Sequence, residues 1–168
     1  MKRLILTVLM IAATATAALA QKYIVVDSEK IFKSIDEYNT AIKSLDTLAE
    51  QYQKTVDDKF KAVETLYNNY MAQKASLTQQ ARTAREREIL EQEQAATEYQ
   101  ESVFGADGVV MKKRIEAIQP IQKRVFAAIE AFAAQQGCDL VVDIASNATV
   151  LYYSPAVDRT EDIIKMLK

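Results

Sequence analysis

Apolar residues recur at helical spacing through most of the chain between positions 39 and 136. From about Tyr38 to Lys74 they step alternately by four and three residues, which places them on one face of a helix. The short polar interval around Ser76-Leu77-Thr78 is a good place for the chain to reverse, and Thr78 is suited to cap a returning helix. The pattern predicts a long antiparallel helical hairpin that is too thin to enclose a core of its own.

Two interruptions modify this hairpin. The heptad rhythm that runs from Tyr38 to Val56 resumes at Phe60 after an extra step of four, and such a stutter locally unwinds a left-handed coiled coil. Gly105 and Gly108 interrupt the returning helix, where each interior glycine costs about 1 kcal/mol relative to alanine. We expect either a hinge or a short loop at the two glycines.

Segments with a strand pattern flank the helices. Residues 23–27 are rich in β-branched side chains and predict a strand buried on both faces. Residues 139–144 and 149–153 predict two further strands, paired antiparallel through a turn at 146–148, and Thr160 can cap a last short helix. Because the hairpin brings its two feet together, the three strands are expected to form one small body. Such a small sheet is marginal alone, so we expect the body to be completed by self-association.

The first twenty residues have the features of an export signal: Lys2 and Arg3, an apolar run, and small residues at Ala18-Leu19-Ala20. The alternative is an uncleaved anchor, but the run of about 16 residues gives roughly 24 Å of helix, short of the ~30 Å of a bilayer core. We expect cleavage after Ala20. The predicted organisation is then a signal peptide (1–20), a body (21–37 and 116–168) and a helical hairpin arm (38–115).

Composition argues against a catalytic or metal site. The chain has no histidine, one cysteine and three glycines, so a histidine base, an intrachain disulfide and a phosphate-binding glycine loop are all excluded. Without Lys2 and Arg3, 19 of the 21 basic residues remain against 23 acidic residues, a balance of −4 that disfavours nucleic-acid binding. We expect no enzyme activity, no cofactor and no metal.

The ends of the mature chain resemble those of the Skp (OmpH-like) family of periplasmic chaperones. The residues that carry the likeness are Ile24 to Phe32, Asp139 to Asp143, and the segment from Thr149 to Lys168. The helical middle matches only as a pattern. The resemblance implies an α+β fold, with a helical hairpin, or coiled-coil tentacle, on a small β-rich body that forms a homotrimer. The Gly105–Gly108 interruption is a departure from the family pattern.

The resemblance also implies a function. Members hold unfolded outer-membrane proteins in a cavity between helical arms, without ATP, and prevent their aggregation in the periplasm. Basic residues at the arm tips are expected to contact membranes or acidic clients. From the residues alone, dimers remain possible, and so does a different role as a structural coiled-coil spacer or adaptor of the cell envelope. In the spacer the aromatic stripe would be wholly internal.

The sequence offers three sets of candidate residues. Large aromatic and sulfur-containing side chains can re-pack around many partners, although about half are expected only to join the two helices. The expected client-binding residues are Tyr52, Phe60, Tyr67, Tyr70, Met71, Leu77 and Tyr99. The expected basic tip consists of Lys74, Arg82, Arg85 and Arg87, and the expected body or oligomer core of Ile24, Val26, Leu140, Val142, Val150 and Tyr152.

Overall fold

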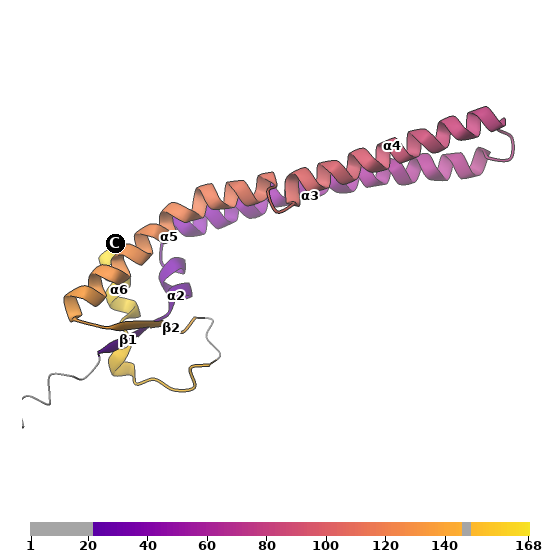
Figure 1. Cartoon of the computed structure of the whole chain (residues 1–168). Helices are drawn as coiled ribbons and strands as arrows, with labels where there is room; N and C mark the ends of the chain where they lie inside the picture. The colour runs from indigo at the N-terminus through magenta and orange to yellow at the C-terminus, as the bar shows by residue number, and fades with distance from the viewer. Residues whose placement is uncertain (1–21, 146–148) are drawn as a thin grey trace, which may run out of the picture. The chain divides into compact units, whose positions relative to one another are not determined.

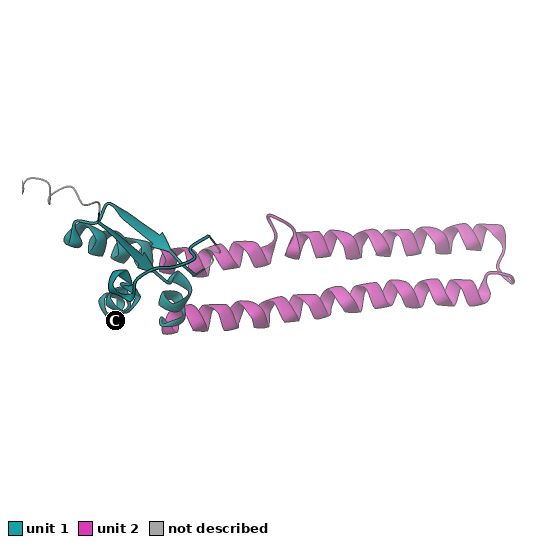
Figure 2. Cartoon of the chain, turned by 90° about the horizontal axis from the view of Figure 1, so that it is seen from below, with its two compact units in different colours: residues 1–35, 123–168 teal, residues 36–122 magenta. Residues whose placement is uncertain are grey.

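The computed structural model describes residues 22–145 and 149–168. The predicted signal peptide and the predicted turn at 146–148 lie outside the described residues. The chain divides into two compact units, which we call the body (Met1–Ile35 and Lys123–Lys168) and the hairpin (Asp36–Gln122) (Figure 2).

In chain order the elements are β1 (Tyr23–Val26), α2 (Ser28–Lys33), α3 (Asp36–Gln73), α4 (Gln79–Phe104), α5 (Val109–Gln136), β2 (Leu140–Asp143), the 3-10 helix η2 (Pro155–Val157) and α6 (Thr160–Leu167) (Figure 1).

The body is built around a two-stranded sheet. Strand β1 pairs in parallel with β2, with Tyr23 opposite Leu140 and Val26 opposite Asp143. On its other edge β1 meets the chain before α6, where the amide of Arg159 donates to the carbonyl of Val25 at 3.0 Å. The first strand is buried on both faces, as its β-branched residues predicted. Ile31 of α2, Val125 of α5 and Ile163 of α6 complete the core, each with no exposed surface.

The predicted third strand is wrong for the single chain. Residues 149–153 form no strand, and the sheet among the described residues has two strands in place of three. Leu151 and Tyr152 are 94% and 84% exposed. A strand pairs its backbone groups with a neighbouring edge, and residues 149–153 join no sheet among the described residues.

The hairpin consists of α3, α4 and the first part of α5, with α3 and α4 packed along each other (Figure 2). Thr78 caps α4 as predicted, its hydroxyl accepting a hydrogen bond from the amide of Ala81 at 3.3 Å. Helix α3 begins at Asp36, and Asp36 and Glu37 lie in its first turn.

The predicted stutter is wrong, because the heptad continues past Val56. The covered side chains of this part of α3 are Val56 and Tyr70, which are buried, and Val63 and Leu66, which are half-buried. Phe60 and Tyr67 are exposed. An unbroken alternation of three and four places Lys59 between Val56 and Val63 at a seam position. The side chain of Lys59 extends from α3 to α4, where its ammonium lies 5.0 Å from the centre of the Tyr99 ring.

The predicted interruption at Gly105–Gly108 is a tight turn between α4 and α5. The amide of Gly105 donates to the carbonyl of Glu101 at 2.8 Å, and that of Gly108 to the carbonyl of Gly105 at 2.9 Å. A Cβ atom on Gly108 would lie 2.4 Å from the carbonyl oxygen of Val103, so this turn excludes larger residues. Helix α5 continues through Pro120. Among the described residues, none of the helices combines the length and apolarity needed to cross a membrane.

Candidate functional site

Within residues 22–145 and 149–168, no three His, Cys, Asp or Glu side chains come together in a way that could hold a metal ion. The hollows are small: one of about 250 Å³ lies beside Tyr70 and Leu77 of the hairpin, and one of about 450 Å³ lies beside Leu140 of the body. The candidate functional sites are therefore exposed surfaces, and the two units carry different kinds.

Four of the seven expected client-binding residues are engaged at or beside the hairpin seam. Tyr70 is only 5% exposed, and its hydroxyl donates to the carboxylate of Glu86 on α4. This hydrogen bond, together with burial, raises the pKa of Tyr70 above its ordinary value of 10.0. Tyr52, Leu77 and Tyr99 are half-buried. Tyr70 and Tyr99 therefore make contacts between α3 and α4, while Tyr52 and Leu77 are only partly covered.

The other three expected residues form an exposed row. Phe60, Tyr67 and Met71 are 36%, 50% and 48% exposed, and their spacing of seven and four puts them on one face of α3. The seam does not need them, because Val63, Leu66 and Tyr70 occupy its positions. We call Phe60, Tyr67 and Met71 the aromatic row.

The basic tip is largely engaged in contacts within the hairpin. Arg85 forms an ion pair with Glu88 at 2.7 Å, and the Nε of Arg82 donates to the carbonyl of Leu77 at 3.2 Å. The ammonium of Lys74 lies 5.3 Å from the centre of the Tyr70 ring. Lys74, Arg85 and Arg87 are all exposed, but of the four cations only Arg87 has no partner among the described residues.

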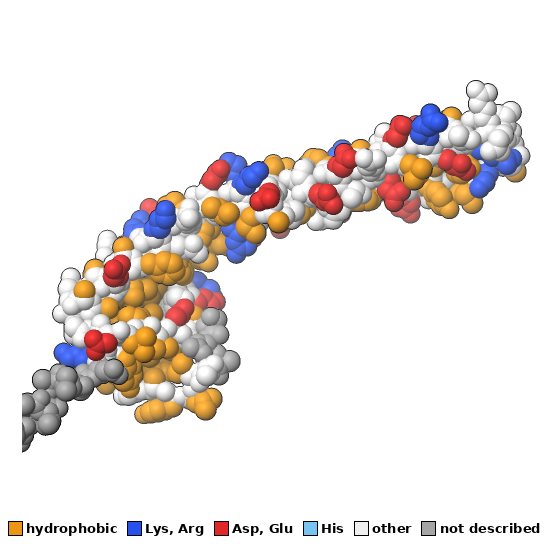
Figure 3. All heavy atoms as spheres, viewed as in Figure 1, with side chains coloured by type: hydrophobic (Ala, Val, Ile, Leu, Met, Phe, Trp, Pro, Cys, Tyr) orange, Lys and Arg blue, Asp and Glu red, His pale blue; other side chains and the backbone are white. Residues whose placement is uncertain are grey.

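The expected body residues divide into two groups. Ile24 and Val26 are buried inside the chain's own core. Val142 and Val150 are half-buried, while Leu140 is 58% exposed and Tyr152 remains on the surface. Beside Leu140, the side chains of Phe126, Ile129 and Ala133 help to line a groove of about 450 Å³ between α5 and β2. Figure 3 shows apolar side chains gathered on the visible face of the body.

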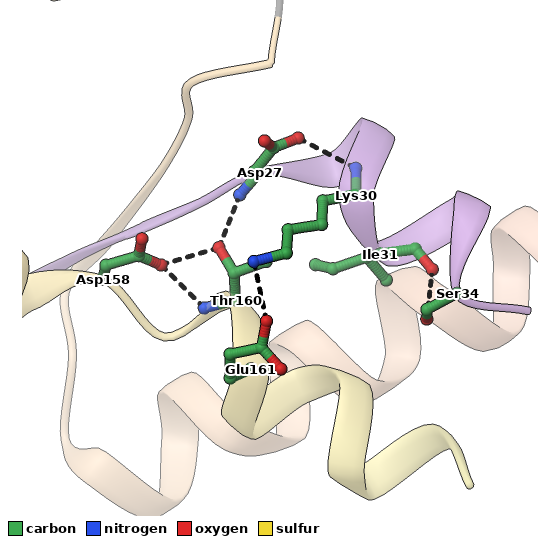
Figure 4. Close-up of polar contacts among 7 residues, drawn as sticks. All are labelled: Asp27, Lys30, Ile31, Ser34, Asp158, Thr160 and Glu161. Atoms are coloured by element: carbon green, nitrogen blue, oxygen red, sulfur yellow. Dashed lines mark hydrogen bonds and ion pairs between the residues drawn. The ribbon is translucent and has the colours of Figure 1, made fainter.

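A polar cluster joins α2 to α6 in the body (Figure 4). Thr160 accepts a hydrogen bond from the amide of Asp27 at 2.9 Å and donates from its hydroxyl to Asp158 at 2.6 Å. The expected cap of α6 by Thr160 is therefore wrong: Arg159 holds the N-cap position, and the threonine hydroxyl bridges two segments. Lys30 and Glu161 form an exposed ion pair at 2.7 Å, which raises the pKa of Lys30 and lowers that of Glu161.

Asp143, at the end of β2, binds the start of α2. Its carboxylate accepts from the amide of Ser28 at 3.0 Å, from the hydroxyl of Ser28 at 2.6 Å and from the amide of Ala145 at 3.1 Å. Partial burial alone would raise the pKa of Asp143, but these hydrogen bonds outweigh it and lower the pKa below its ordinary value of 3.8. These contacts hold the sheet to α2, so their role is structural.

Sequence reasoning missed a second exposed apolar face, on the first part of α5. Met111 and Ile115 are 44% and 50% exposed and line a groove of about 310 Å³ with Ile118. Their spacing of four and three is visible in the sequence, but packing between helices would explain it equally well. The exposed Leu90 and Phe104 on α4 were missed for the same reason.

Comparison with known proteins places this architecture in a family. The family described as "Outer membrane protein (OmpH-like)" matches residues 22–167. The chain is 29% identical over 165 residues to the chaperone protein Skp of Pectobacterium atrosepticum, covering 95% of this chain and 93% of that protein. A crystal structure of an OmpH-like outer-membrane chaperone from Caulobacter crescentus CB15 has the same fold, with a TM-score of 0.65 at 15% identity over 88% of this chain and 84% of that one. The chain belongs to the OmpH-like outer membrane protein family.

Proposed function

We propose that this protein is an ATP-independent holdase chaperone that binds unfolded outer-membrane proteins and prevents their aggregation. The observation that carries the proposal is the aromatic row. Phe60, Tyr67 and Met71 are large apolar side chains that the hairpin exposes without needing them for its own packing. The relative named as the chaperone protein Skp supports the same role.

The chemistry of the aromatic row suits a client without a fixed shape. Each apolar contact contributes only about 25 cal/mol per Å² of buried surface. Tyr and Met side chains adapt to differently shaped partners. Many weak contacts within one assembly add through effective concentration. Release then needs no nucleotide, because a client that folds or inserts withdraws its own apolar surface.

A homotrimer supplies the assembly in this proposal. Among the described residues no strand pairs with the outer edge of β2. The body also exposes Leu140 and Tyr152 and has an apolar groove beside α5. Several hairpins rooted in one shared body would surround a cavity, with the aromatic rows available to a client. The expected location is the periplasm, after cleavage behind Ala20. Arg87 is then the best placed of the tip cations for transient contact with a membrane surface.

The test is the suppression of aggregation when a urea-unfolded outer-membrane protein is diluted into buffer. We expect the wild-type protein to suppress light scattering at about one trimer per client, and the triple variant Phe60→Ser, Tyr67→Ser, Met71→Ser to require several-fold more protein. Mass measurement of both proteins in solution accompanies the assay and tests the trimer.

A matched control changes Lys61, Asn68 and Ala72, the residues that directly follow those of the aromatic row in sequence, to Ser. This control should suppress aggregation like wild type. A wild-type protein that assembles but leaves the client to aggregate would instead favour the structural spacer.

A further inference from the structure

The groove on the first part of α5 has a lining unlike that of the aromatic row. Its six lining residues come from one face of the helix at spacings of three and four: Met111, Arg114, Ile115, Ile118, Gln119 and Gln122. Ile118 is 7% exposed and forms the floor, while Met111 and Ile115 are about half exposed. The groove lies wholly within the hairpin.

The polar groups of the groove are open to a partner. The side chains of Gln119 and Gln122 make no hydrogen bond with another described residue, and neither does Arg114. A carboxamide offers two donors and an acceptor, which can pair with the N–H and C=O groups of an extended backbone. The guanidinium of Arg114 offers donors and a positive charge suited to a carboxylate.

Charge sets this groove apart from the residues that directly precede it. Between residues 88 and 107 the chain has six acidic residues and no basic one, whereas residues 109–122 contain Lys112, Lys113 and Arg114 against Glu116 alone. Glu116 is already paired with Lys113 at 2.9 Å and does not line the groove. A segment bearing carboxylates is therefore repelled by residues 88–107 and attracted by the start of α5.

We infer that the groove formed by Met111, Arg114, Ile115, Ile118, Gln119 and Gln122 binds extended, acid-bearing apolar segments of an unfolded polypeptide. This inference rests on the proposed chaperone function and assigns it a second contact surface with its own specificity. Apolar side chains of the segment cover Met111 and Ile115, its backbone pairs with the two glutamines, and its carboxylate contacts Arg114. The aromatic row lacks this charge preference, because its three residues are uncharged.

Two labelled synthetic peptides provide the probe. Both alternate Val and Thr and contain a central Pro that prevents strand assembly; one has Asp at spaced polar positions, and the other has Lys at the same positions. Fluorescence anisotropy with the full-length mature protein should show about threefold tighter binding of the Asp peptide. The variant Arg114→Gln should abolish that preference, and Met111→Ser with Ile115→Ser should weaken binding of the Asp peptide about tenfold.

The matched control is Leu90→Ser, which removes an exposed apolar side chain of α4 that lies outside the groove. Its binding of the Asp peptide should equal that of wild type. Equal losses in Leu90→Ser and in the Met111/Ile115 variant would overturn the inference, and so would a preference for the Lys peptide. A change of mass in solution for the Met111/Ile115 variant would also overturn it, because the groove would then be an interface between copies.

The aggregation assay separates this inference from the proposed function. If wild type fails to protect an unfolded outer-membrane protein, the proposed function is wrong. If wild type protects the client and the Met111/Ile115 variant binds the Asp peptide as well as wild type does, only the inference about the groove is wrong.

Discussion

The body and the hairpin bury their apolar residues in different ways. In the body, side chains from β1, α2, α5 and α6 meet in one cluster, and Ile31, Val125 and Ile163 have no exposed surface. In the hairpin, buried residues such as Val56, Tyr70 and Ala96 recur one at a time along a seam, and large apolar side chains remain outside it. The body has a core, whereas the hairpin has only an interface between helices. A thin interface leaves apolar surface for partners, which the proposed holdase function requires.

The most direct way to test this difference is to remove one fully buried side chain from the body. Ile163→Ala should lower the free energy of unfolding by about 2–5 kcal/mol, because it removes buried methyl groups and leaves a cavity. Urea denaturation followed by circular dichroism measures the change, at one fixed protein concentration since self-association shifts the apparent stability. Leu90→Ala, at a site that is 64% exposed on the hairpin, should change it by less than about 0.5 kcal/mol. Similar losses in both variants would contradict the division into core and seam.

A second comparison uses one glycine from each unit. In the hairpin, Gly108→Ala places a Cβ atom 2.4 Å from the backbone oxygen of Val103, so the turn must move, at a cost of about 1–3 kcal/mol. In the body, Gly137 has φ of 62°, and a Cβ atom added to it would meet nothing within 4 Å. Gly137→Ala should cost about 1 kcal/mol from the left-handed backbone alone.

We also expect asparagine to recover the lost stability at one glycine position and not at the other, as measured by the same denaturation experiment. Gly137→Asn should recover most of the loss, since asparagine tolerates the left-handed conformation. Gly108→Asn should not, because the clash comes from the Cβ atom itself. Full recovery by asparagine at position 108 would show that the turn between α4 and α5 can yield, as in a hinge.

The position of Lys59 tests the unbroken heptad of α3. Lys59→Leu should raise the free energy of unfolding by about 0.5–1 kcal/mol, because a seam position gains apolar contact in exchange for the weaker contact of the ammonium with Tyr99. Phe60→Ser, one residue along, should cost less than about 1 kcal/mol, since Phe60 lies outside the seam. Thermal melting of the two variants distinguishes the alternatives, because a stutter at this point would give the opposite order.

The sequence predicted the features of this fold that arise from local chemistry. The hydroxyl of Thr78 caps α4, and the returning helix is interrupted at Gly105 and Gly108. Each depends on a few neighbouring residues. The boundary between α3 and α4 and the two-sided burial of β1 could be predicted for the same reason.

The failures concern residues whose partners lie far away in sequence. The charge of Lys59 argues against a seam position, although its long side chain reaches the ring of Tyr99 on the opposite helix. Residues 149–153 have a strand pattern but no paired strand in the part of the chain that the structure describes. The candidate site shows the same limit: exposure separates Phe60 from Tyr70, and helix periodicity alone cannot make that distinction.

The smallest expected effect concerns acid stability of the body. The hydrogen bonds from Ser28 and Ala145 lower the pKa of Asp143 in the folded state, so the ionised carboxylate stabilises the fold. This contribution is fully present above the ordinary pKa of 3.8 and is lost as the pH falls through the lower folded value. The stability difference between wild type and Asp143→Asn should therefore be constant near neutral pH and shrink below about pH 4. Urea denaturation at a series of pH values measures it, and Ser28→Ala should show a weaker form of the same trend because the amide of Ser28 still donates. A difference that stays constant down to about pH 2 would mean that the charge of Asp143 adds nothing to its hydrogen bonds.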